Sequence, residues 1–231
     1  MNQGNITFRF RQFALTDRRC GMKIGTDAVV AGVLADMAAP EGRVADIGAG
    51  CGIISLMIAQ RFPSATVDAV EIDAGAFLDL KENVDNSSFK SRLNPVEGDF
   101  NLLTGPYDLI VSNPPYYNNG EVAPDASRAI ARHARGLSGF SLLDFAVSKL
   151  SAEGKLAMII PSVIAEEVEA EAIFKRLYLS RRVDVATSRR RGITRSFLEF
   201  VRSASVIPSK STLEVNSDEW AELTREFYIK Q

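Results

Sequence analysis

Short apolar segments alternate with longer amphipathic segments along most of the chain, and the alternation begins near residue 43. Apolar runs rich in β-branched residues predict strands, whereas apolar residues at a spacing of three to four predict helices. The sequence predicts strands at residues 43–48, 66–73, 93–99, 107–113, 155–162, 180–187 and 195–205. It predicts helices at residues 25–37, 52–62, 75–87, 139–154 and 163–178.

This order of elements predicts an α/β fold with a doubly wound, seven-stranded, mostly parallel sheet. The last two strands are joined by a short loop, so we expect them to form an antiparallel hairpin at one edge of the sheet. Pro95 lies in the third strand and indicates a strand start or a weakly paired position. The chain has 231 residues and no internal repeat or clear linker, which favours a single domain over residues 1–231.

Composition is that of an ordinary globular protein, with 46% hydrophobic and 24% charged residues. No apolar run approaches the roughly 18 residues of a membrane-spanning helix. The first residues lack the apolar core of a secretory signal, so we expect a cytoplasmic protein without a membrane partner. Cys20 and Cys51 are too few and too far apart in sequence for a metal cluster or a disulfide framework, and we expect no metal.

The net charge of −2 conceals two basic segments. Residues 1–23 hold five basic residues against one acid, and residues 175–202 hold nine against two. A basic surface on an otherwise acidic chain favours a polyanionic partner, although solvated arginines on separate faces would give the same counts. The run "TSRRRGITR" at residues 187–195 is typical of an exposed loop.

Between the strand predicted at residues 43–48 and the helix predicted at residues 52–62, "VADIGAGCGIISL" places Asp46 before three glycines, Gly48, Gly50 and Gly52. Glycines allow a tight turn and a close approach of a ligand to the backbone at the carboxyl ends of the strands. A dinucleotide motif would need glycine where Ile53 stands, and the Lys-Ser/Thr of an ATP loop is absent. An acid before the turn suits a ligand with a cationic end, such as the amino acid and sulfonium groups of S-adenosylmethionine.

The fourth predicted strand runs into "NPPY", where the prolines cannot continue the ladder. The side-chain oxygen of Asn113 and the carbonyl of Pro114 can accept both N–H groups of a conjugated amine, which makes its nitrogen a better nucleophile. Pro115 has no N–H to compete, and Tyr116 offers a ring for stacking. Catalysis would then rest on positioning and preorganised hydrogen bonds.

Together these motifs resemble those of class I S-adenosylmethionine-dependent methyltransferases, which have a Rossmann-like fold. In those enzymes one acid chelates the ribose hydroxyls, matching Glu71 in "VEID", and another lies near the adenine amino group, matching Asp99 in "EGD". The resemblance implies catalytic roles for Asn113, Pro114, Pro115 and Tyr116, and cofactor contacts from Asp46, Gly48, Gly50, Gly52, Glu71, Asp99 and Asn113.

The N-terminal "FRFRQFALTDRRCGMKIGTDAVVAG" resembles the opening of bacterial tRNA (adenine-N6) methyltransferases that modify the purine beside the anticodon of a valine tRNA. That family has "MKxGTDxxxLG" here, and this chain departs from it with Ala31 at the leucine. The resemblance implies that residues 1–38 form a basic arm and a helix covering the cofactor, with contacts from Lys23, Gly25, Thr26 and Asp27. "RAIARHARGLSGFSLLDF", from residue 128, is also similar to that family.

An RNA substrate would be bound by basic residues of three segments. The predicted RNA-binding residues are Arg9, Arg11, Arg128, Arg132, His133, Arg189, Arg190, Arg191 and Arg195. His133 is equally compatible with a solvated position on an arginine-rich turn.

The predicted function is methylation of N6 of an adenine in tRNA, next to the anticodon (A37) of a valine tRNA, by a monomeric enzyme. The motif itself fits other amines, so a release-factor glutamine methyltransferase and an rRNA N6-adenine or N2-guanine methyltransferase remain alternatives. Outside enzymes, a sensor that binds S-adenosylmethionine is the alternative. The first 35 residues are too short for the helical domain of the glutamine enzymes, and a sensor needs no amine clamp.

Overall fold

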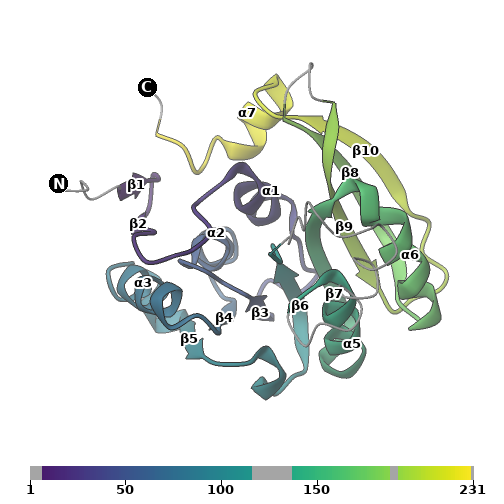
Figure 1. The fold of residues 1–231 in the computed structure, drawn as a ribbon, viewed down its shortest axis with the longest axis horizontal. Coiled ribbons are helices and arrows are strands. Elements are labelled where there is room, and N and C mark those ends of the chain that lie inside the picture. Colours follow the sequence, from purple (N-terminus) through teal and green to yellow (C-terminus); the bar gives the residue numbers. More distant parts are fainter. Residues whose placement is uncertain (1–6, 116–136, 188–191, 230–231) are drawn as a thin grey trace, which may run out of the picture.

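The computed structural model describes residues 7–115, 137–187 and 192–229. Within these ranges the main sheet has eight strands, in the order β10-β8-β9-β7-β6-β3-β4-β5 (Figure 1). The strands are β3 (Arg43–Ile47), β4 (Thr66–Glu71), β5 (Leu93–Glu97), β6 (Tyr107–Ser112), β7 (Leu150–Pro161), β8 (Tyr178–Ala186), β9 (Ile193–Val201) and β10 (Ser209–Glu214). Only β9 runs antiparallel to its neighbours in this described sheet. The doubly wound, mostly parallel α/β fold is therefore confirmed.

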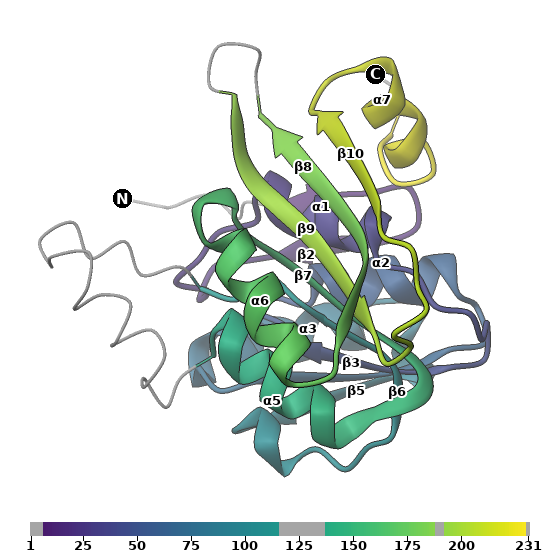
Figure 2. The ribbon, with the colours of Figure 1, turned by 90° about the vertical axis from the view of Figure 1, so that its right-hand side faces the viewer.

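The predicted strand count and sheet edge were wrong. The antiparallel hairpin exists as β8 and β9, but an eighth strand, β10, pairs in parallel with β8 and forms the edge (Figure 2). β10 escaped the sequence pattern because Leu213 is its one buried residue, so it lacks an apolar run. At the opposite edge lies β5, which contains Pro95, and an edge strand tolerates the missing N–H.

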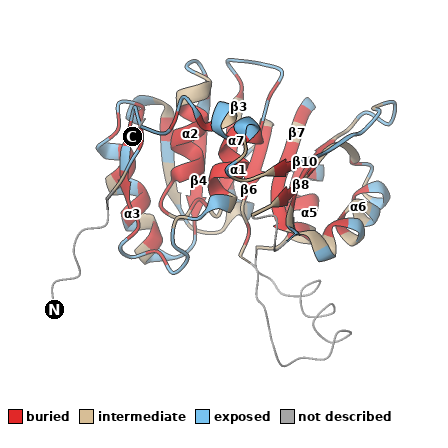
Figure 3. Cartoon of the chain, turned by 90° about the horizontal axis from the view of Figure 1, so that it is seen from above, coloured by how far each residue is buried: buried red, intermediate tan, exposed pale blue. Residues whose placement is uncertain are grey.

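Helices cover both faces of the sheet (Figures 1 and 3). One face packs against α1 (Thr26–Leu34), α2 (Ile53–Arg61), α3 (Ala74–Asp85) and α7 (Asp218–Thr224), and the other against α5 (Gly139–Lys149) and α6 (Ala165–Phe174). Short 3-10 helices are η1 (Lys90–Arg92), η2 (Phe100–Leu102) and η3 (Ser162–Ile164). Strand residues alternate between the two cores, as Val44 and Ala45 do, so the central strands β3, β6 and β7 are apolar on both sides.

The helix predicted for residues 139–154 ends five residues earlier, at Lys149, and β7 begins with the next residue, Leu150. Arg202, directly after β9, donates from Nη2 to the carbonyls of Ala146, Val147 and Leu150, which caps the end of α5. A contact from far along the chain therefore ends this helix, and no local signal marks the position.

The described part of the chain begins with a two-stranded antiparallel sheet, β1 (Thr7–Arg9) and β2 (Ala14–Thr16). This hairpin packs against the C-terminal residues, because the N–H of Arg11 donates to the carbonyl of Phe227 at 2.8 Å. The ring of Phe10 also stacks on Tyr228, with centroids 5.7 Å apart. Both ends of the described chain are thus fixed beside each other.

Asp68 joins the amino ends of four neighbouring strands. Its carboxylate accepts hydrogen bonds from Arg43 at 2.6 Å, Asn94 at 2.9 Å and the hydroxyl of Tyr107 at 2.8 Å. The guanidinium of Arg43 also lies over the Tyr107 ring, 4.6 Å from its centroid. Burial alone would raise the pKa of Asp68, but these hydrogen bonds outweigh it and hold the pKa below its usual value.

Asp68→Ala is expected to lower the free energy of unfolding by about 2–4 kcal/mol, because the buried Tyr107 hydroxyl and the Arg43 guanidinium lose their shared partner. Urea unfolding at pH 7 measures this loss. Glu97→Ala, at an exposed position of β5, is the control and should change stability by less than about 0.5 kcal/mol. A loss below about 1 kcal/mol for Asp68→Ala would show that this network does not stabilise the fold.

Candidate functional site

Three parallel strands end side by side at one edge of the sheet, which we call the carboxyl edge. Ile47 at the end of β3 lies opposite Val70 of β4 on one side and Ser112 of β6 on the other. The hydroxyl of Ser112 donates to the carbonyl of Ile47 at 2.7 Å, which fixes the ends of β3 and β6 together. The chain leaves β3 toward one side of the sheet and β6 toward the other, and such a switch point is where open α/β sheets bind ligands.

The glycine-rich turn follows β3 at this edge. Gly48, Gly50 and Gly52 all have positive φ angles, of 68°, 57° and 87°, which glycine adopts without strain. A side chain at Gly48 would also meet Leu137, whose Cδ2 lies 2.4 Å from the position of a Cβ. At Gly50 a Cβ would have no atom of the described residues within 4 Å apart from its chain neighbours, so these residues leave open space before this part of the backbone.

Glu71 ties the turn to the end of β4. Its Oε2 accepts the N–H of Gly50 at 2.8 Å, and its Oε1 accepts the N–H of Asp73 at 2.9 Å. Asp73 is the N-cap of α3, because its side chain accepts the N–H of Ala76 at 2.8 Å. The predicted ribose-binding acid therefore stands directly against the glycine-rich turn.

Asp46 is fully buried between β3 and α2, beneath the turn. Its Oδ2 accepts the hydroxyl of Ser55 at 2.6 Å, whereas its Oδ1 has no hydrogen-bond partner in the described protein. Burial raises the pKa of Asp46 to about 7, with a further contribution from the charge of Glu71 and opposition from the hydrogen bonds of Ser55. A buried carboxylate oxygen without a donor fits a cationic group, as the ammonium end of S-adenosylmethionine would provide.

Asp99 lies beyond β5 and caps η2. Its Oδ1 accepts the N–H and the side-chain amide of Asn101, both at 2.8 Å. Two large apolar side chains outside the predicted site residues are exposed here: Ile72 is 72% exposed and Leu102 is 70% exposed. In the sequence, an apolar residue directly after a motif acid such as Glu71 is the signal that would have found Ile72. Apolar surface beside a ligand site suits a flat ring.

The N-terminus of α1 reaches the same edge as the turn. Arg61 at the end of α2 donates to the carbonyls of Gly32 and Ala35 at the end of α1, so the two helices run in the same direction. Gly32 permits this packing, since a Cβ there would lie 2.5 Å from the sulfur of Met57. Gly25 is the N-cap of α1 and Thr26 its first residue.

Asp27 and Arg195, predicted for different ligands, are brought together. The Arg195 Nε donates to Asp27 Oδ2 at 2.7 Å. Arg195 pairs with Pro161 at the carboxyl end of β7, so this ion pair joins α1 to β9 at the carboxyl edge. Lys23 is turned toward its own segment, and its Nζ donates to the carbonyl of Asp17 at 2.5 Å.

Asn113, Pro114 and Pro115 directly follow β6, beside the glycine-rich turn. Pro114 is buried, and Asn113 and Pro115 are half-buried. The remaining predicted residues Tyr116, Arg128, Arg132, His133, Arg189, Arg190 and Arg191 lie outside the described residues.

Arg9 and Arg11 are not brought to the site. Both belong to the β1–β2 hairpin, and the Arg11 Nη1 donates to the carbonyl of Arg225 at 3.2 Å. The neighbouring carbonyl of Glu226 accepts a hydrogen bond from Gln60, near the C-terminal end of α2. This region therefore lies toward the amino ends of the parallel strands, away from the carboxyl edge. The structure gives these two arginines no contact with the carboxyl edge.

Several basic residues of segment 175–202 are neutralised within the protein. Arg182 pairs with Asp184 at 2.8 Å and Glu169 at 2.9 Å, and Lys175 with Asp144 at 2.5 Å. Arg202 is also engaged, because it caps α5. The charge count alone therefore overstated the basic surface of this segment.

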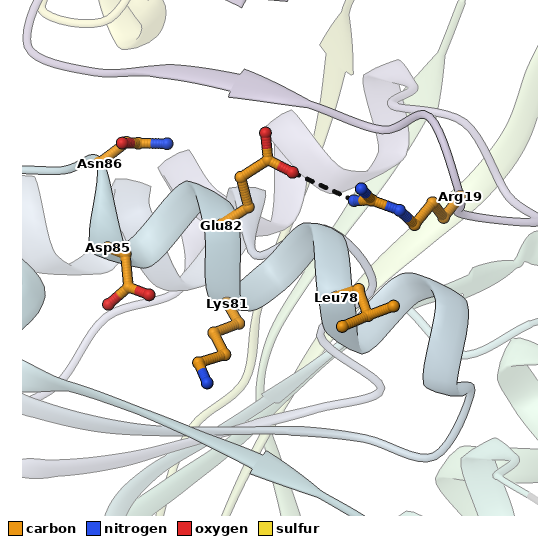
Figure 4. Close-up of a pocket in the computed structure, with 6 residues that line it drawn as sticks. All are labelled: Arg19, Leu78, Lys81, Glu82, Asp85 and Asn86. Atoms are coloured by element: carbon orange, nitrogen blue, oxygen red, sulfur yellow. Dashed lines mark hydrogen bonds and ion pairs between the residues drawn. The ribbon is translucent and has the colours of Figure 1, made fainter.

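A separate hollow of about 340 Å³ lies on the outer face of α3 (Figure 4). It is lined by Arg19, Leu78, Lys81, Glu82, Asp85 and Asn86. The Arg19 Nη1 forms an ion pair with Glu82 Oε2 at 3.1 Å. None of the motif residues lines this open polar surface, so it is not the candidate site.

Within the described ranges, no group of three or more His, Cys, Asp or Glu side chains could hold a metal ion. In the same ranges, no helix has the length and apolar character needed to cross a membrane.

The chain is similar to known methyltransferases along most of its length. The profile of the methyltransferase small domain family matches residues 21–183. A tRNA1(Val) (adenine(37)-N6)-methyltransferase from Bacteroides thetaiotaomicron is 37% identical over 97% of this chain and 98% of its own length. A protein of the same name from Tolumonas auensis is 36% identical over 98% of both chains.

Solved structures support the fold. A predicted O-methyltransferase from Agrobacterium tumefaciens superposes with a TM-score of 0.65 at 18% identity, covering 87% of this chain and 96% of the other. The M1A22 tRNA methyltransferase TrmK from B. subtilis gives a TM-score of 0.55 at 18% identity, covering 78% of this chain and 67% of the other.

Proposed function

The chain belongs to the tRNA1(Val) (adenine(37)-N6)-methyltransferase family, and from this membership we propose that it methylates N6 of adenine 37 in a valine tRNA with S-adenosylmethionine as the methyl donor. The observation that carries the proposal is the similarity over 97% of the chain, which spans the N-terminal arm, the glycine-rich turn and the Asn-Pro-Pro corner together. We also infer that the protein is cytoplasmic and monomeric; light scattering on the purified protein tests the oligomeric state.

The residues at the carboxyl edge fit the cofactor. Asp46 would hold the ammonium group under the glycine-rich turn, and Glu71 would accept the ribose hydroxyls with its remaining lone pairs. Asp99 would bind the adenine amino group, with Ile72 and Leu102 beside the ring. Residues 23–27 would cover the site. When bound, S-adenosylmethionine supplies an electrophilic methyl group on a sulfonium.

Asn113 and Pro114 would activate the target amine. The N6 amino group of adenine is a poor nucleophile because its lone pair is delocalised into the ring. The Asn113 side-chain oxygen and the Pro114 carbonyl each accept one N–H, which favours the tetrahedral nitrogen of the transition state. Pro115 leaves the Pro114 carbonyl without a competing N–H, and Tyr116 would stack on the base. The methylated nitrogen loses its proton to water afterwards.

One assay separates this function from its rivals. Labelled S-adenosylmethionine is offered with unmodified total tRNA and, in parallel, with a release factor and with unmodified rRNA. We expect label in tRNA, recovered as N6-methyladenosine after digestion to nucleosides. Label in the release factor would establish the glutamine reaction instead, and label in rRNA the ribosomal one. Cofactor binding without transfer to any of the three would indicate a sensor.

Arg195 and Arg11 provide a matched test of where RNA binds. Arg195→Gln is expected to weaken tRNA binding and reduce the slope of log K against log salt by about one, because one phosphate contact is lost at the carboxyl edge. Arg11→Gln, on the hairpin remote from that edge, should leave the slope unchanged. Filter binding over a range of salt concentrations measures both. An unchanged slope for Arg195→Gln would remove this residue from the interface.

A further inference from the structure

The N-terminal arm, which is residues 7–24 of the described chain, and the glycine-rich turn, residues 48–52, are joined through one buried side chain, Asn83 of α3. Its Oδ1 accepts the N–H of Thr16 at 2.9 Å, and its Nδ2 donates to the carbonyls of Thr16 and Cys51, both at 2.8 Å. Thr16 ends β2, whereas Cys51 lies inside the turn, directly before Gly52. Asn83 is 2% exposed, so water does not replace these partners.

Asp79, one helical turn before Asn83, binds the arm alone. Its Oδ2 accepts the N–H groups of Arg19 at 2.6 Å and Cys20 at 3.2 Å, and its Oδ1 accepts the Arg19 guanidinium at 2.7 Å. Asp79 is fully buried, and every hydrogen bond that the described residues give it goes to the arm.

The anchored arm leads directly to the segment that covers the candidate cofactor site. Asp17 is buried, and its Oδ2 accepts the N–H of Ile24 at 2.9 Å. The Nζ of Lys23 donates to the backbone carbonyl of Asp17, which is a second contact between residues 17 and 23–24. The position of Thr16 on Asn83 therefore fixes where residues 25–27 and the start of α1 lie.

We propose that Asn83 is a positioning residue for the cofactor, which couples the arm to the glycine-rich turn so that the two enclose the ligand at a fixed separation. It acts through Thr16 and Cys51 and touches no predicted ligand contact itself. A side-chain amide suits this task because it accepts from one backbone group and donates to two others. The inference rests on the proposed function, since S-adenosylmethionine is the ligand concerned.

Calorimetric titration of the purified full-length protein with S-adenosylmethionine tests this coupling. Asn83→Ala is expected to raise the Kd about tenfold or more, since the turn and the covering segment lose their shared anchor. Affinity for tRNA in the same variant should stay within about twofold. Asn86→Ala, at the exposed C-cap position of the same helix, is the matched control and should leave the Kd unchanged.

Hydrogen exchange of the free protein separates coupling from a general loss of stability. Asn83→Ala should speed exchange in residues 16–24 and 50–53 together, whereas Asp79→Asn should speed it in the arm alone. Asn83→Ser is the second variant if Asn83→Ala does not fold, because it keeps a polar group in the same space. An unchanged Kd in a folded Asn83 variant, or faster exchange in the arm without the turn, would overturn the coupling. If the wild-type protein itself binds no S-adenosylmethionine, it is the proposed function that fails.

Discussion

Asn113→Ala is expected to lower kcat by about 100- to 1000-fold, because the target amine loses one of the two acceptors that stabilise its transition state. The Kd for S-adenosylmethionine should stay within about twofold, since Asn113 is only one of the predicted cofactor contacts and the cofactor keeps the others, among them Asp46 and Glu71. Single-turnover transfer to tRNA and calorimetric titration with the cofactor measure the two quantities separately.

Asn113→Asp provides the comparison for this prediction. A carboxylate oxygen also accepts an N–H, so Asn113→Asp should retain more activity than Asn113→Ala. Equal loss in both variants would mean that the amide is needed for something other than accepting a hydrogen bond. Loss of cofactor binding in Asn113→Ala would contradict the assigned role, because the residue would then serve the cofactor rather than the base.

Asp46→Asn is expected to weaken binding of S-adenosylmethionine by about 100-fold or more, because a buried cation loses its partner charge. In the wild-type protein the affinity should rise with pH up to about 7, where Asp46 ionises, and level off above it. The Asp46→Asn variant keeps its contact with Ser55 but cannot ionise, so its affinity should not follow this profile. Titrations between pH 5.5 and 8.5 measure both. An affinity independent of pH in the wild-type protein would remove Asp46 from the cofactor site.

The same carboxyl should make stability depend on pH. Its pKa in the folded protein, about 7, is higher than the usual 3.8, so the folded state binds the proton more tightly than the unfolded state. The stability that Asp46 contributes is therefore fully present below about pH 4 and is lost as the pH rises through about 7. Without ligand, Asp46→Asn should melt at a higher temperature than wild type at pH 8, and the difference should shrink toward pH 5.

Most of the site could be predicted from sequence because its parts follow strand ends. Asp46, the three glycines, Glu71 and Asn113 each stand within a few residues of a predicted strand terminus, and parallel strands carry such residues to one edge. The structure brings these residues together as expected. Their roles as ligand contacts remain predictions that the variants above test.

The features missed by the sequence depend on contacts between distant segments. β10 has little apolar character and exists because β8 offers it a free edge, and the end of α5 is determined by Arg202. Asn83 reads as an ordinary helical residue, because its partners Thr16 and Cys51 are far from it in the chain. The basic segments misled for the same reason, since a count of charges does not show which are already paired.

The central claim is that this protein methylates N6 of adenine 37 in a valine tRNA. The most direct measurement uses two transcripts of that tRNA, one with adenine at position 37 and one with guanine there, with labelled S-adenosylmethionine and nucleoside analysis. We predict one labelled N6-methyladenosine per adenine-37 transcript and none in the guanine-37 transcript. Equal labelling of both transcripts, or label in a nucleoside other than N6-methyladenosine, would contradict it.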